Sequence, residues 1–297
     1  MLVMDVTWKF RDDDSYESGI SVWMEGNTNP QFIPLPPGTE LAWSFAGPRR
    51  CIGIRETTGA VIPCPEGAGV RKGMQRCGPC AAMDSMDSCI RCSGKECRAT
   101  EERLAQCRRT EYSIYVVVFN DKTLKVGVSS KRRLRTRWIE QGADFAGVLL
   151  DITGGMAARR MEDTLGRVPG ATKQVRAERK AKQLLDKLDI SEAEILVHDY
   201  ISSLKTVDIP TPVKLESLEG YYSLHDLDSK PTPWKKRSIS VDKLQLAGEV
   251  VGMKGALLVT RNGSAFTVTN LRDIIGYAID ETQPINTVTQ SGLLDYL

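Results

Sequence analysis

Histidine is scarce in this chain, with only His198 and His225 among 297 residues. Ser-His-Asp catalysis and zinc enzymes that use several imidazoles both depend on histidine, so the sequence argues against these classes. No apolar run approaches the roughly 20 residues of a membrane-spanning helix, and we expect no contact with a membrane. The first residues lack the basic and then apolar pattern of a signal peptide. We therefore expect a cytoplasmic protein.

Charge is nearly balanced over the whole chain but is unevenly distributed along it. The total is +2, whereas residues 125–182 contain 14 Lys and Arg against 6 Asp and Glu, a local +8 that leaves −6 elsewhere. Charge concentrated in one region indicates a surface that faces a polyanion, and nucleic acid is the first candidate. The simpler interpretation is the solvated face of a basic helix.

The length predicts about two domains with room for small modules. Alternating apolar residues in the first 50 positions are typical of half-buried strands, and Asn262-Gly263 between apolar runs predicts a hairpin near the other end. We therefore expect an α+β protein in which a small three-stranded sheet with helices is flanked by β modules. The expected units are an N-terminal β module (1–50), a Cys-rich module (51–110), an α/β core (111–205) and a C-terminal β module (206–297).

All eight cysteines fall within residues 51–107. Cys77/Cys80 and Cys89/Cys92 have the Cys-x-x-Cys spacing, which lets one tight turn present two thiolates to a tetrahedral ion. We predict two structural zinc sites of four cysteines each, although an interleaved grouping is also compatible with the spacing. In sequence order the groups are Cys51, Cys64, Cys77 and Cys80, then Cys89, Cys92, Cys97 and Cys107.

Three other interpretations of the cysteines are weaker. Disulfides need an oxidising compartment, for which the sequence gives no signal. Residues 77–80 match the thioredoxin tetrapeptide but lack the strand and long helix of that fold. Iron–sulfur ligation is the third. Zinc is favoured because this segment has too few large apolar residues to fold unaided, and a closed four-sulfur shell points to a structural role.

The α/β core follows the cysteines. Residues 113–120 and 123–128 predict a β-hairpin, and residues 145–152 predict a third strand. Helices are expected from Ser129 or Ser130 to about Gln141, near residues 156–165, and from Thr172 to about Leu188. Basic side chains on the first and third of these helices are candidate nucleic-acid contacts: Lys131, Arg132, Arg133, Arg135, Lys173, Arg176 and Lys180.

Residues 112–189 resemble the GIY-YIG nuclease superfamily. Ser113-Ile114-Tyr115 stands at the first motif and Lys125-Val126-Gly127 at the second. Most of the chain also resembles an uncharacterised, largely archaeal family of unknown function in which paired cysteines precede such a core. The strings that carry this second resemblance are Lys125-Val126-Gly127, Thr136-Arg137-Trp138, Gln141-Gly142-Ala143 and residues 248–255.

The nuclease resemblance implies roles for four residues. Tyr115 would orient or deprotonate a water, Arg137 would bind the phosphate, and Glu162 would ligate Mg²⁺ or Mn²⁺. Arg135 is the alternative to Arg137, but the two lie about 200° apart on a helix, so both cannot face one site. Lys125 replaces the tyrosine of the second motif, where it would supply positive charge but not a phenol.

Three functions follow as hypotheses. The first is a metal-dependent endonuclease that cleaves RNA or DNA. The second is a non-catalytic zinc protein that binds RNA or DNA, for example in association with the ribosome, and retains the nuclease fold. The third is a zinc-braced adaptor whose basic face meets an acidic protein.

Overall fold

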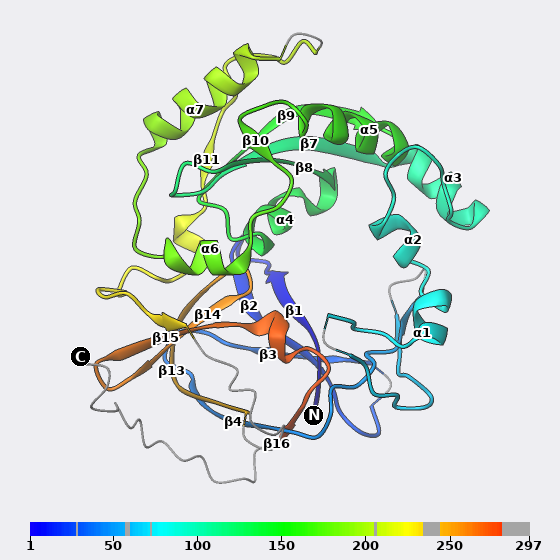
Figure 1. Ribbon diagram of the computed structural model, residues 1–297, viewed down its shortest axis with the longest axis vertical. Helices are drawn as coiled ribbons and strands as arrows, with labels where there is room; N and C mark the ends of the chain where they lie inside the picture. Colours follow the sequence, from blue (N-terminus) through cyan, green and yellow to red (C-terminus); the bar gives the residue numbers. More distant parts are fainter. Residues whose placement is uncertain (28, 57–59, 72, 205–206, 234–243, 281–297) are drawn as a thin grey trace.

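The computed structural model describes residues 1–27, 29–56, 60–71, 73–204, 207–233 and 244–280. It confirms a mixed α+β chain, in which strands are more prominent than expected because one sheet has nine of them. A five-stranded sheet with its helices forms the upper half of the molecule in Figure 1, and the larger sheet forms the lower half. Residues 281–297 of the expected C-terminal module lie outside the described residues.

The nine-stranded sheet joins the two ends of the chain. Its order is β12-β15-β14-β13-β4-β16-β1-β2-β3, and its neighbours are antiparallel except for the parallel pair β12 and β15. Strands β1 to β4 of the first expected module and β12 to β16 of the last therefore share one sheet, because β16 inserts between β1 and β4. The strands are β1 Leu2–Phe10, β2 Tyr16–Trp23, β3 Gln31–Pro34, β4 Glu40–Ala46, β12 Thr232–Pro233, β13 Leu244–Lys254, β14 Leu257–Asn262, β15 Ala265–Asn270 and β16 Ala278–Asp280.

The five-stranded sheet has the order β10-β8-β7-β9-β11. Its three central strands lie where the sequence predicts them, and two short edge strands extend it beyond the expected three. The strands are β7 Glu111–Val118, β8 Leu124–Ser130, β9 Phe145–Thr153, β10 Ala171–Thr172 and β11 Glu216–Ser217. The helices of this half are η1 Lys131–Arg133, α4 Leu134–Glu140, α5 Gly155–Leu165, α6 Ala177–Lys182, α7 Ile190–Ser202 and η2 Glu219–Tyr221.

Alternation along β7 divides the core between two faces. Ile114, Val116 and Val118 pack against α5 and α7 on one face. Tyr115 and Val117 lie on the other face, in the same apolar cluster as residues of α4 and the nine-stranded sheet. Successive side chains of a strand point to opposite faces, so β7 contributes side chains to both apolar clusters. The face that carries Tyr115 is therefore enclosed between the two sheets.

The prediction of a long helix from Thr172 to about Leu188 is wrong. Ala171 and Thr172 instead pair in parallel with β8 as β10, and the helix α6 covers only Ala177–Lys182. The ladder bonds offered by the edge of β8 hold this segment extended, so tertiary pairing overrides a helical pattern. As a result Lys173 and Arg176 lie in a connecting segment instead of on the helix that carries Lys180.

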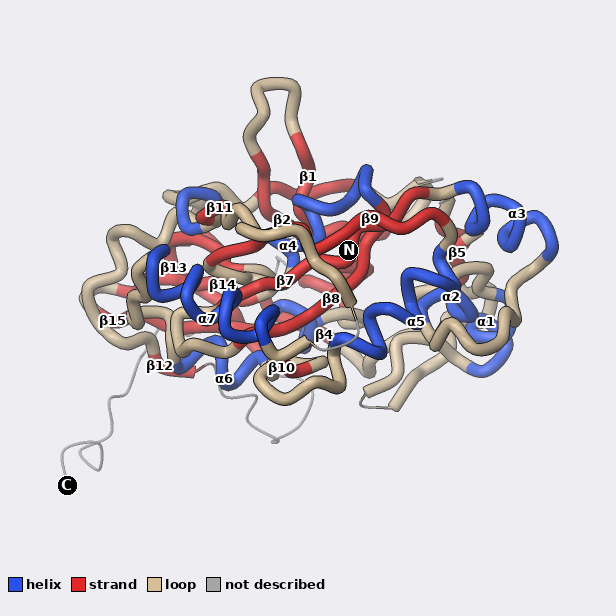
Figure 2. The backbone as a smooth tube through the Cα atoms, turned by 90° about the horizontal axis from the view of Figure 1, so that it is seen from above, coloured by secondary structure: helices blue, strands red, loops and turns tan. Residues whose placement is uncertain are grey.

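The Cys-rich segment contains little regular structure and lies at one end of the molecule, with β13 and β15 toward the other end (Figure 2). It holds the hairpin β5 Ile54–Arg55 and β6 Val61–Ile62, and the helices α1 Gly78–Met83, α2 Asp87–Ile90 and α3 Glu101–Arg109. A further short helix, η4 Leu271–Ile274, precedes β16. Among the described residues, none of these helices has the length and apolar character that crossing a bilayer requires.

Candidate functional site

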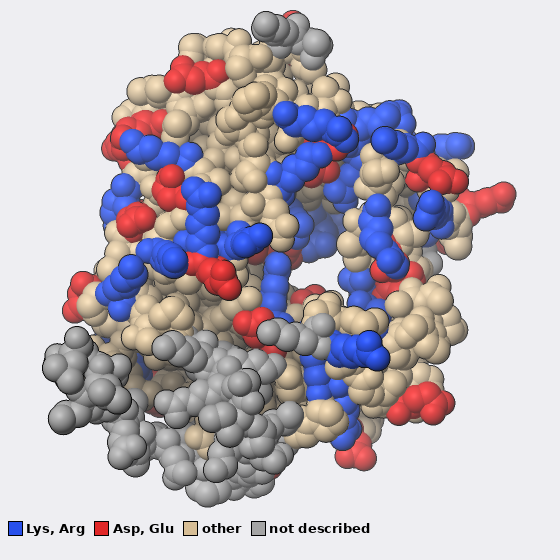
Figure 3. All heavy atoms as spheres, in the orientation of Figure 1, with Lys and Arg blue, Asp and Glu red and all other residues tan. Residues whose placement is uncertain are grey.

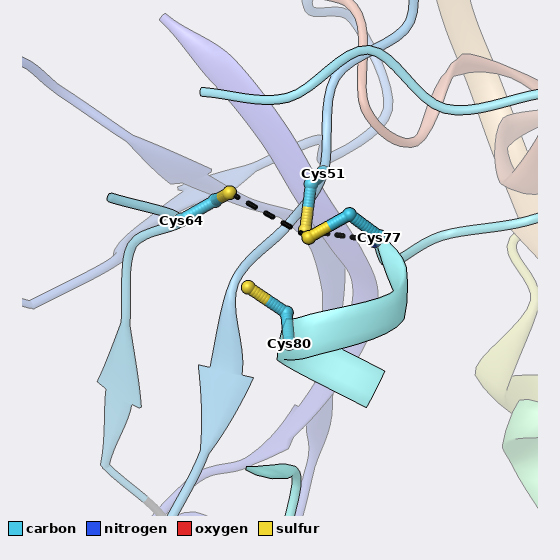
Figure 4. A group of neighbouring side chains, drawn as sticks. All are labelled: Cys51, Cys64, Cys77 and Cys80. Atoms are coloured by element: carbon cyan, nitrogen blue, oxygen red, sulfur yellow. Dashed lines mark hydrogen bonds between the residues drawn. The ribbon is translucent and has the colours of Figure 1, made fainter. Parts of the chain in front are cut away.

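Four cysteines from three segments point toward one another: Cys51, Cys64, Cys77 and Cys80 (Figure 4). Their sulfur atoms lie within 4.8 Å of one another, and the Sγ atoms of Cys64 and Cys77 are 3.9 Å apart. Sulfurs about 2.3 Å from a tetrahedral zinc ion stand roughly 3.8 Å from each other. The cluster could therefore hold a metal ion such as zinc, and it is the first of the two groups that the sequence order gives.

The local backbone explains why these cysteines meet. Cys77 precedes α1, whose start is fixed by Pro79, and Cys80 lies in the first turn of that helix. Gly53 has φ 78°, and a Cβ there would stand 2.0 Å from the carbonyl oxygen of Ile62, so only glycine permits this close approach. The N–H of Cys77 donates to the Cys51 sulfur at 3.2 Å. Backbone geometry therefore positions three of the four ligands.

The environment of the four thiols differs from one to the next. Burial would raise the pKa of Cys64, but the backbone N–H groups of Ala68 and Glu66 outweigh it and lower that pKa to about 7. Burial raises the pKa of Cys80 and of Cys51. Thiolates are the form that binds metal, so Cys64 is the thiol most ready to ligate an ion.

A buried carboxylate fixes the end of α1 beside this cluster. Arg55 and Arg76 place their Nε atoms 3.1 Å and 2.9 Å from Oδ2 of Asp84, whose side chain is fully buried. Burial would raise the pKa of Asp84, but the hydrogen bonds from Arg55 outweigh it and lower the pKa. This ion pair ties α1 to β5 and so braces the ligand Cys80.

The second predicted group is not assembled. Among the described residues, only the first four cysteines gather within metal-ligand distance of each other. Cys107 accepts a hydrogen bond from the Tyr112 hydroxyl at 3.9 Å, and Cys89 accepts one from Arg103 at 3.9 Å. Cys89 and Cys107 both lie within electrostatic range of Tyr112, whose pKa is raised to about 12 by burial and by Cys107.

Tyr115 lies against β8 opposite Gly127. A Cβ at Gly127 would stand 2.5 Å from the phenol ring, so glycine is needed for the ring to cross the strand. Trp138 of α4 packs against the ring in a T-shaped arrangement with centroids 6.2 Å apart. Tyr115 is consequently only 1% exposed. Gly127, the last residue of the second motif, therefore leaves the space that the ring of Tyr115 in the first motif occupies.

Gln141 connects Tyr115 with Lys125. A lysine ammonium can only donate hydrogen bonds, so the Gln141 Oε1 atom faces Lys125 and accepts from it. The Nε2 atom then faces Tyr115 and donates to its hydroxyl oxygen at 2.7 Å. Because that oxygen is an acceptor here, the O–H hydrogen of Tyr115 remains available for another partner. Gln141, which the sequence did not single out as a site residue, thus orients the phenol.

The titration behaviour of this group follows from burial. Burial is the main reason that the pKa of Tyr115 is raised to about 12; Glu162 raises it further, and Arg137 opposes the change. Burial and the nearby Arg137 lower the pKa of Lys125 to about 8, although Glu162 opposes them. A phenol with such a pKa stays protonated at neutral pH, so Tyr115 is a hydrogen-bond donor there and not a base.

The four residues assigned catalytic roles lie near one another. Arg137 and Glu162 are each within electrostatic range of both Tyr115 and Lys125. Arg135 lies on the other side of α4, where it binds Glu216 at 2.9 Å. Glu162 bonds to Arg159 at 3.0 Å. Arg137 rather than Arg135 thus faces the tyrosine.

Most of the other basic residues proposed for nucleic acid are paired with carboxylates. Lys131 pairs with Asp151, Arg133 with Glu140 and Lys173 with Asp163. Arg132 and Arg176 are exposed. Lys180 is half-buried, and its Nζ atom donates to the Gln141 carbonyl oxygen at 2.5 Å.

Lys180 and Arg272 bring further positive charge to Lys125 and Arg137. Burial lowers the pKa of Lys180 to about 7, and Lys125, Arg272, Lys254 and Arg137 lower it further. Arg272 comes from η4, far along the chain. Figure 3 shows Lys and Arg side chains gathered around a hollow between the two sheets and the Cys-rich segment. No sequence signal pointed to Arg272, because only tertiary packing brings η4 here.

The two sheets contact each other through sequence segments that carried the family resemblance. A Cβ at Gly142 would stand 3.1 Å from the Gly255 nitrogen, so the two backbones pack directly together. The Nζ atom of Lys254 lies 2.6 Å from Oδ1 of Asp144, and both side chains are buried. The indole of Trp8 donates to the Gly255 carbonyl oxygen at 2.7 Å. These strings therefore build the junction between the sheets.

A family model described as a protein of unknown function (DUF2797) matches residues 38–279. The chain belongs to this family. The DUF2797 match begins after β3 and ends within β16, so it includes the cysteines, the five-stranded sheet and the junction. The expectation of a family of unknown function is thus confirmed, and the family description assigns no activity.

Comparison with curated proteins and with solved structures finds no match to the chain.

Proposed function

We propose that this protein binds nucleic acid at the cluster of Lys125, Arg137, Lys180 and Arg272. The observation that carries the proposal is the approach of four cations from β8, α4, α6 and η4, each within electrostatic range of others in the group. Phosphate contacts supply most of the sequence-independent affinity of nucleic-acid-binding proteins. The segregated charge of residues 125–182 supports the same partner.

Replacing Arg137 with alanine is expected to weaken binding about tenfold or more, because a charge-assisted hydrogen bond to phosphate contributes roughly 1.5–3 kcal/mol. Fluorescence anisotropy with single- and double-stranded RNA and DNA, over a range of salt concentrations, measures the loss. Arg135→Ala is the matched control, since Arg135 has the same charge on the same helix but binds Glu216 on the other side. Equal losses for the two variants would contradict this site.

A second candidate is phosphodiester cleavage, and the observation that favours it is the proximity of Tyr115, Arg137 and Glu162. In hydrolysis a water oxygen bonds to phosphorus, the bond to the leaving oxygen breaks, and that oxygen gains a proton. Arg137 and Lys125 would offset charge on the phosphate. Protonated Tyr115 would orient the water or protonate the leaving oxygen. Activation of water by a tyrosinate is disfavoured by the raised pKa of this phenol.

Glu162 would have to leave Arg159 to hold Mg²⁺ or Mn²⁺. One carboxylate together with substrate phosphate oxygens is a ligand set that Mg²⁺ accepts, and the ion would supply charge stabilisation at the phosphate. Cleavage assays with either ion test this candidate. Cleavage that is lost in both Tyr115→Phe and Glu162→Ala supports it, whereas salt-sensitive binding without cleavage supports binding alone. The adaptor hypothesis is supported if no nucleic acid binds at low salt.

We infer a second zinc site from Cys89, Cys92, Cys97 and Cys107. Metal binding supplies free energy that can order a site not assembled without it, and Cys89 and Cys107 already lie within electrostatic range of the same tyrosine, Tyr112. Elemental analysis of protein purified without chelator should give about two zinc ions per chain on the four-ligand rule. Replacing Cys89 and Cys92 together with serine should remove one of them. A single zinc ion in the wild type, or iron, would contradict the assignment.

A further inference from the structure

The ammonium groups of Lys125 and Lys180 are anchored on a single neutral residue. Lys125 donates to the side-chain oxygen of Gln141, and Lys180 donates to the backbone oxygen of the same residue at 2.5 Å. Both lysines are half-buried, and Gln141 itself is 6% exposed. Two lysine charges are therefore held side by side in a partly desolvated place, which is unfavourable unless an opposite charge offsets them.

The described residues offer little opposite charge. Neither lysine, nor Arg272, forms an ion pair with a carboxylate in the part of the chain that the structure describes. Arg137 shares Glu140 with Arg133, at 3.5 Å and 2.8 Å respectively. Asp5 lies within electrostatic range of Arg272 but not in contact with it. Glu162 lies within electrostatic range of Lys125 but is paired with Arg159. The cations of this group consequently outnumber the carboxylates near them.

The arrangement of these groups suits a small anion. Lys125 and Lys180 are half-buried, whereas Arg137 and Arg272 are exposed. The lysines therefore lie deeper than the arginines, which stand at the surface. The cations come from four separate elements, β8, α6, α4 and η4. A phosphate group has oxygens that can accept from several such donors at once. A peptide carboxylate, with two oxygens and one charge, would leave most of these donors unused.

We propose that Lys125, Lys180, Arg137 and Arg272 form a binding site for a dianionic phosphate monoester. Such a group occurs at the end of a nucleic-acid strand and on a free nucleotide, and both have the charge that this site lacks. A phosphodiester within a strand carries one charge and matches it less well. Binding of a strand end at this site rests on the proposed function, because it requires that the protein binds nucleic acid. Binding of a phosphate dianion alone does not depend on that proposal.

Sulfate tests the dianion site without nucleic acid. Isothermal titration should show saturable binding to the wild type at low ionic strength, and Lys125→Gln or Lys180→Gln should weaken it about tenfold or more, the effect of losing one charge-assisted hydrogen bond. Lys182→Gln is the matched control, because Lys182 is an exposed lysine on the same helix as Lys180. Thermal unfolding without sulfate checks that each variant folds. Absence of saturable binding, or equal binding by all variants, overturns the proposal.

Titration with pH provides a second measurement. Lys180 and Lys125 have pKa values lowered to about 7 and about 8. The charged groups near Lys180 are the cations Lys125, Arg137, Lys254 and Arg272, and those near Lys125 are Arg137, Arg272 and the carboxylate of Glu162, which opposes the shift. Sulfate keeps its charge in this range, so its affinity should fall as pH rises through these values and the ammonium groups lose protons. Lys180→Arg should bind sulfate with a weaker pH dependence. An affinity that is unchanged across this range contradicts the lysine site.

Oligonucleotides distinguish the two sources of phosphate. A strand with a 5′- or 3′-phosphate should bind more tightly than the same strand with hydroxyl ends, and Lys180→Gln should remove the difference. If strand ends make no difference while a mononucleotide competes with sulfate, the site stands with a free nucleotide as its ligand. If sulfate binds but no oligonucleotide does, the proposed function fails and the dianion site stands. Binding of oligonucleotides without any binding of sulfate or mononucleotide overturns this inference alone.

Discussion

Cys80→Ser is expected to unfold the segment around the four-cysteine cluster and to abolish its metal binding. The apolar core of this segment is small, since its buried members are Cys51, Ile54 and Cys80. Structural zinc contributes roughly 10–16 kcal/mol in zinc-finger peptides, far more than so small a core can supply. Serine is close to cysteine in shape, although slightly smaller, but does not offer a thiolate. Losing one ligand should therefore remove most of the stability of residues 51–84.

Elemental analysis and hydrogen exchange measure this effect together. The amide protons of β5 and α1 should lose their protection in Cys80→Ser, and a chelator should produce the same loss in the wild type. Cys97→Ser is the control, because Cys97 lies outside the assembled cluster; protection at β5 and α1 should survive it. Retention of metal and of protection in Cys80→Ser would show that the cluster is not a metal centre.

Local patterns in the sequence predicted the features that depend on neighbouring residues. The β-branched apolar run at residues 114–119 located β7, and the polar turn after it located β8. The Cys-x-x-Cys spacing identified Cys77 and Cys80 as candidate joint ligands, and the structure groups them with Cys51 and Cys64, as the sequence order predicts. In each case the signal spans a few residues, and the backbone geometry that uses it is equally local.

Features that depend on distant pairing could not be predicted in this way. Nothing in the sequence of β16 shows that it inserts between β1 and β4. The segment after Thr172 has a helical pattern, yet the free edge of β8 draws its start into the sheet. Arg272 reaches the candidate site only because η4 precedes β16 in that sheet. The composition of the cationic site is therefore a consequence of the fold and not of a motif.

The strings at residues 141–143 and 248–255 show a related difficulty. They resembled family signatures, and a signature is easily taken for a catalytic feature. In the structure Gly142 packs on Gly255, and Lys254 meets Asp144 one residue beyond Ala143. Gln141 alone turns from this junction toward Tyr115. These sequence segments therefore mainly pack the two sheets against each other, and this packing positions the residues of the candidate site.

Lys254→Met is expected to destabilise this junction by about 3–5 kcal/mol, because removing one partner of a buried ion pair leaves the other charge unpaired. Asp144 would keep only the N–H of Asn120, at 2.9 Å, as a donor from the five-stranded half. Urea unfolding of the full chain, followed by tryptophan fluorescence, measures the loss. Lys187→Met is the control: Lys187 and its partner Glu219 are both largely exposed, and such a pair contributes less than about 1 kcal/mol.

The double variant Asp144→Asn/Lys254→Met and the pH dependence identify the cause of that loss. Asparagine can still accept from Asn120 but carries no charge, so the double variant should be more stable than Lys254→Met alone.

Burial already raises the pKa of Asp144 above 3.8 although Lys254 opposes it, and without Lys254 that pKa rises further. A raised pKa in the folded state means that the folded chain binds the proton more readily than the unfolded chain. The loss in Lys254→Met should therefore be complete at neutral pH and should shrink as pH falls through the raised pKa, since protonated Asp144 is neutral. A loss that is independent of pH and is not relieved by Asp144→Asn would mean that packing, and not the unpaired charge, makes Lys254 necessary.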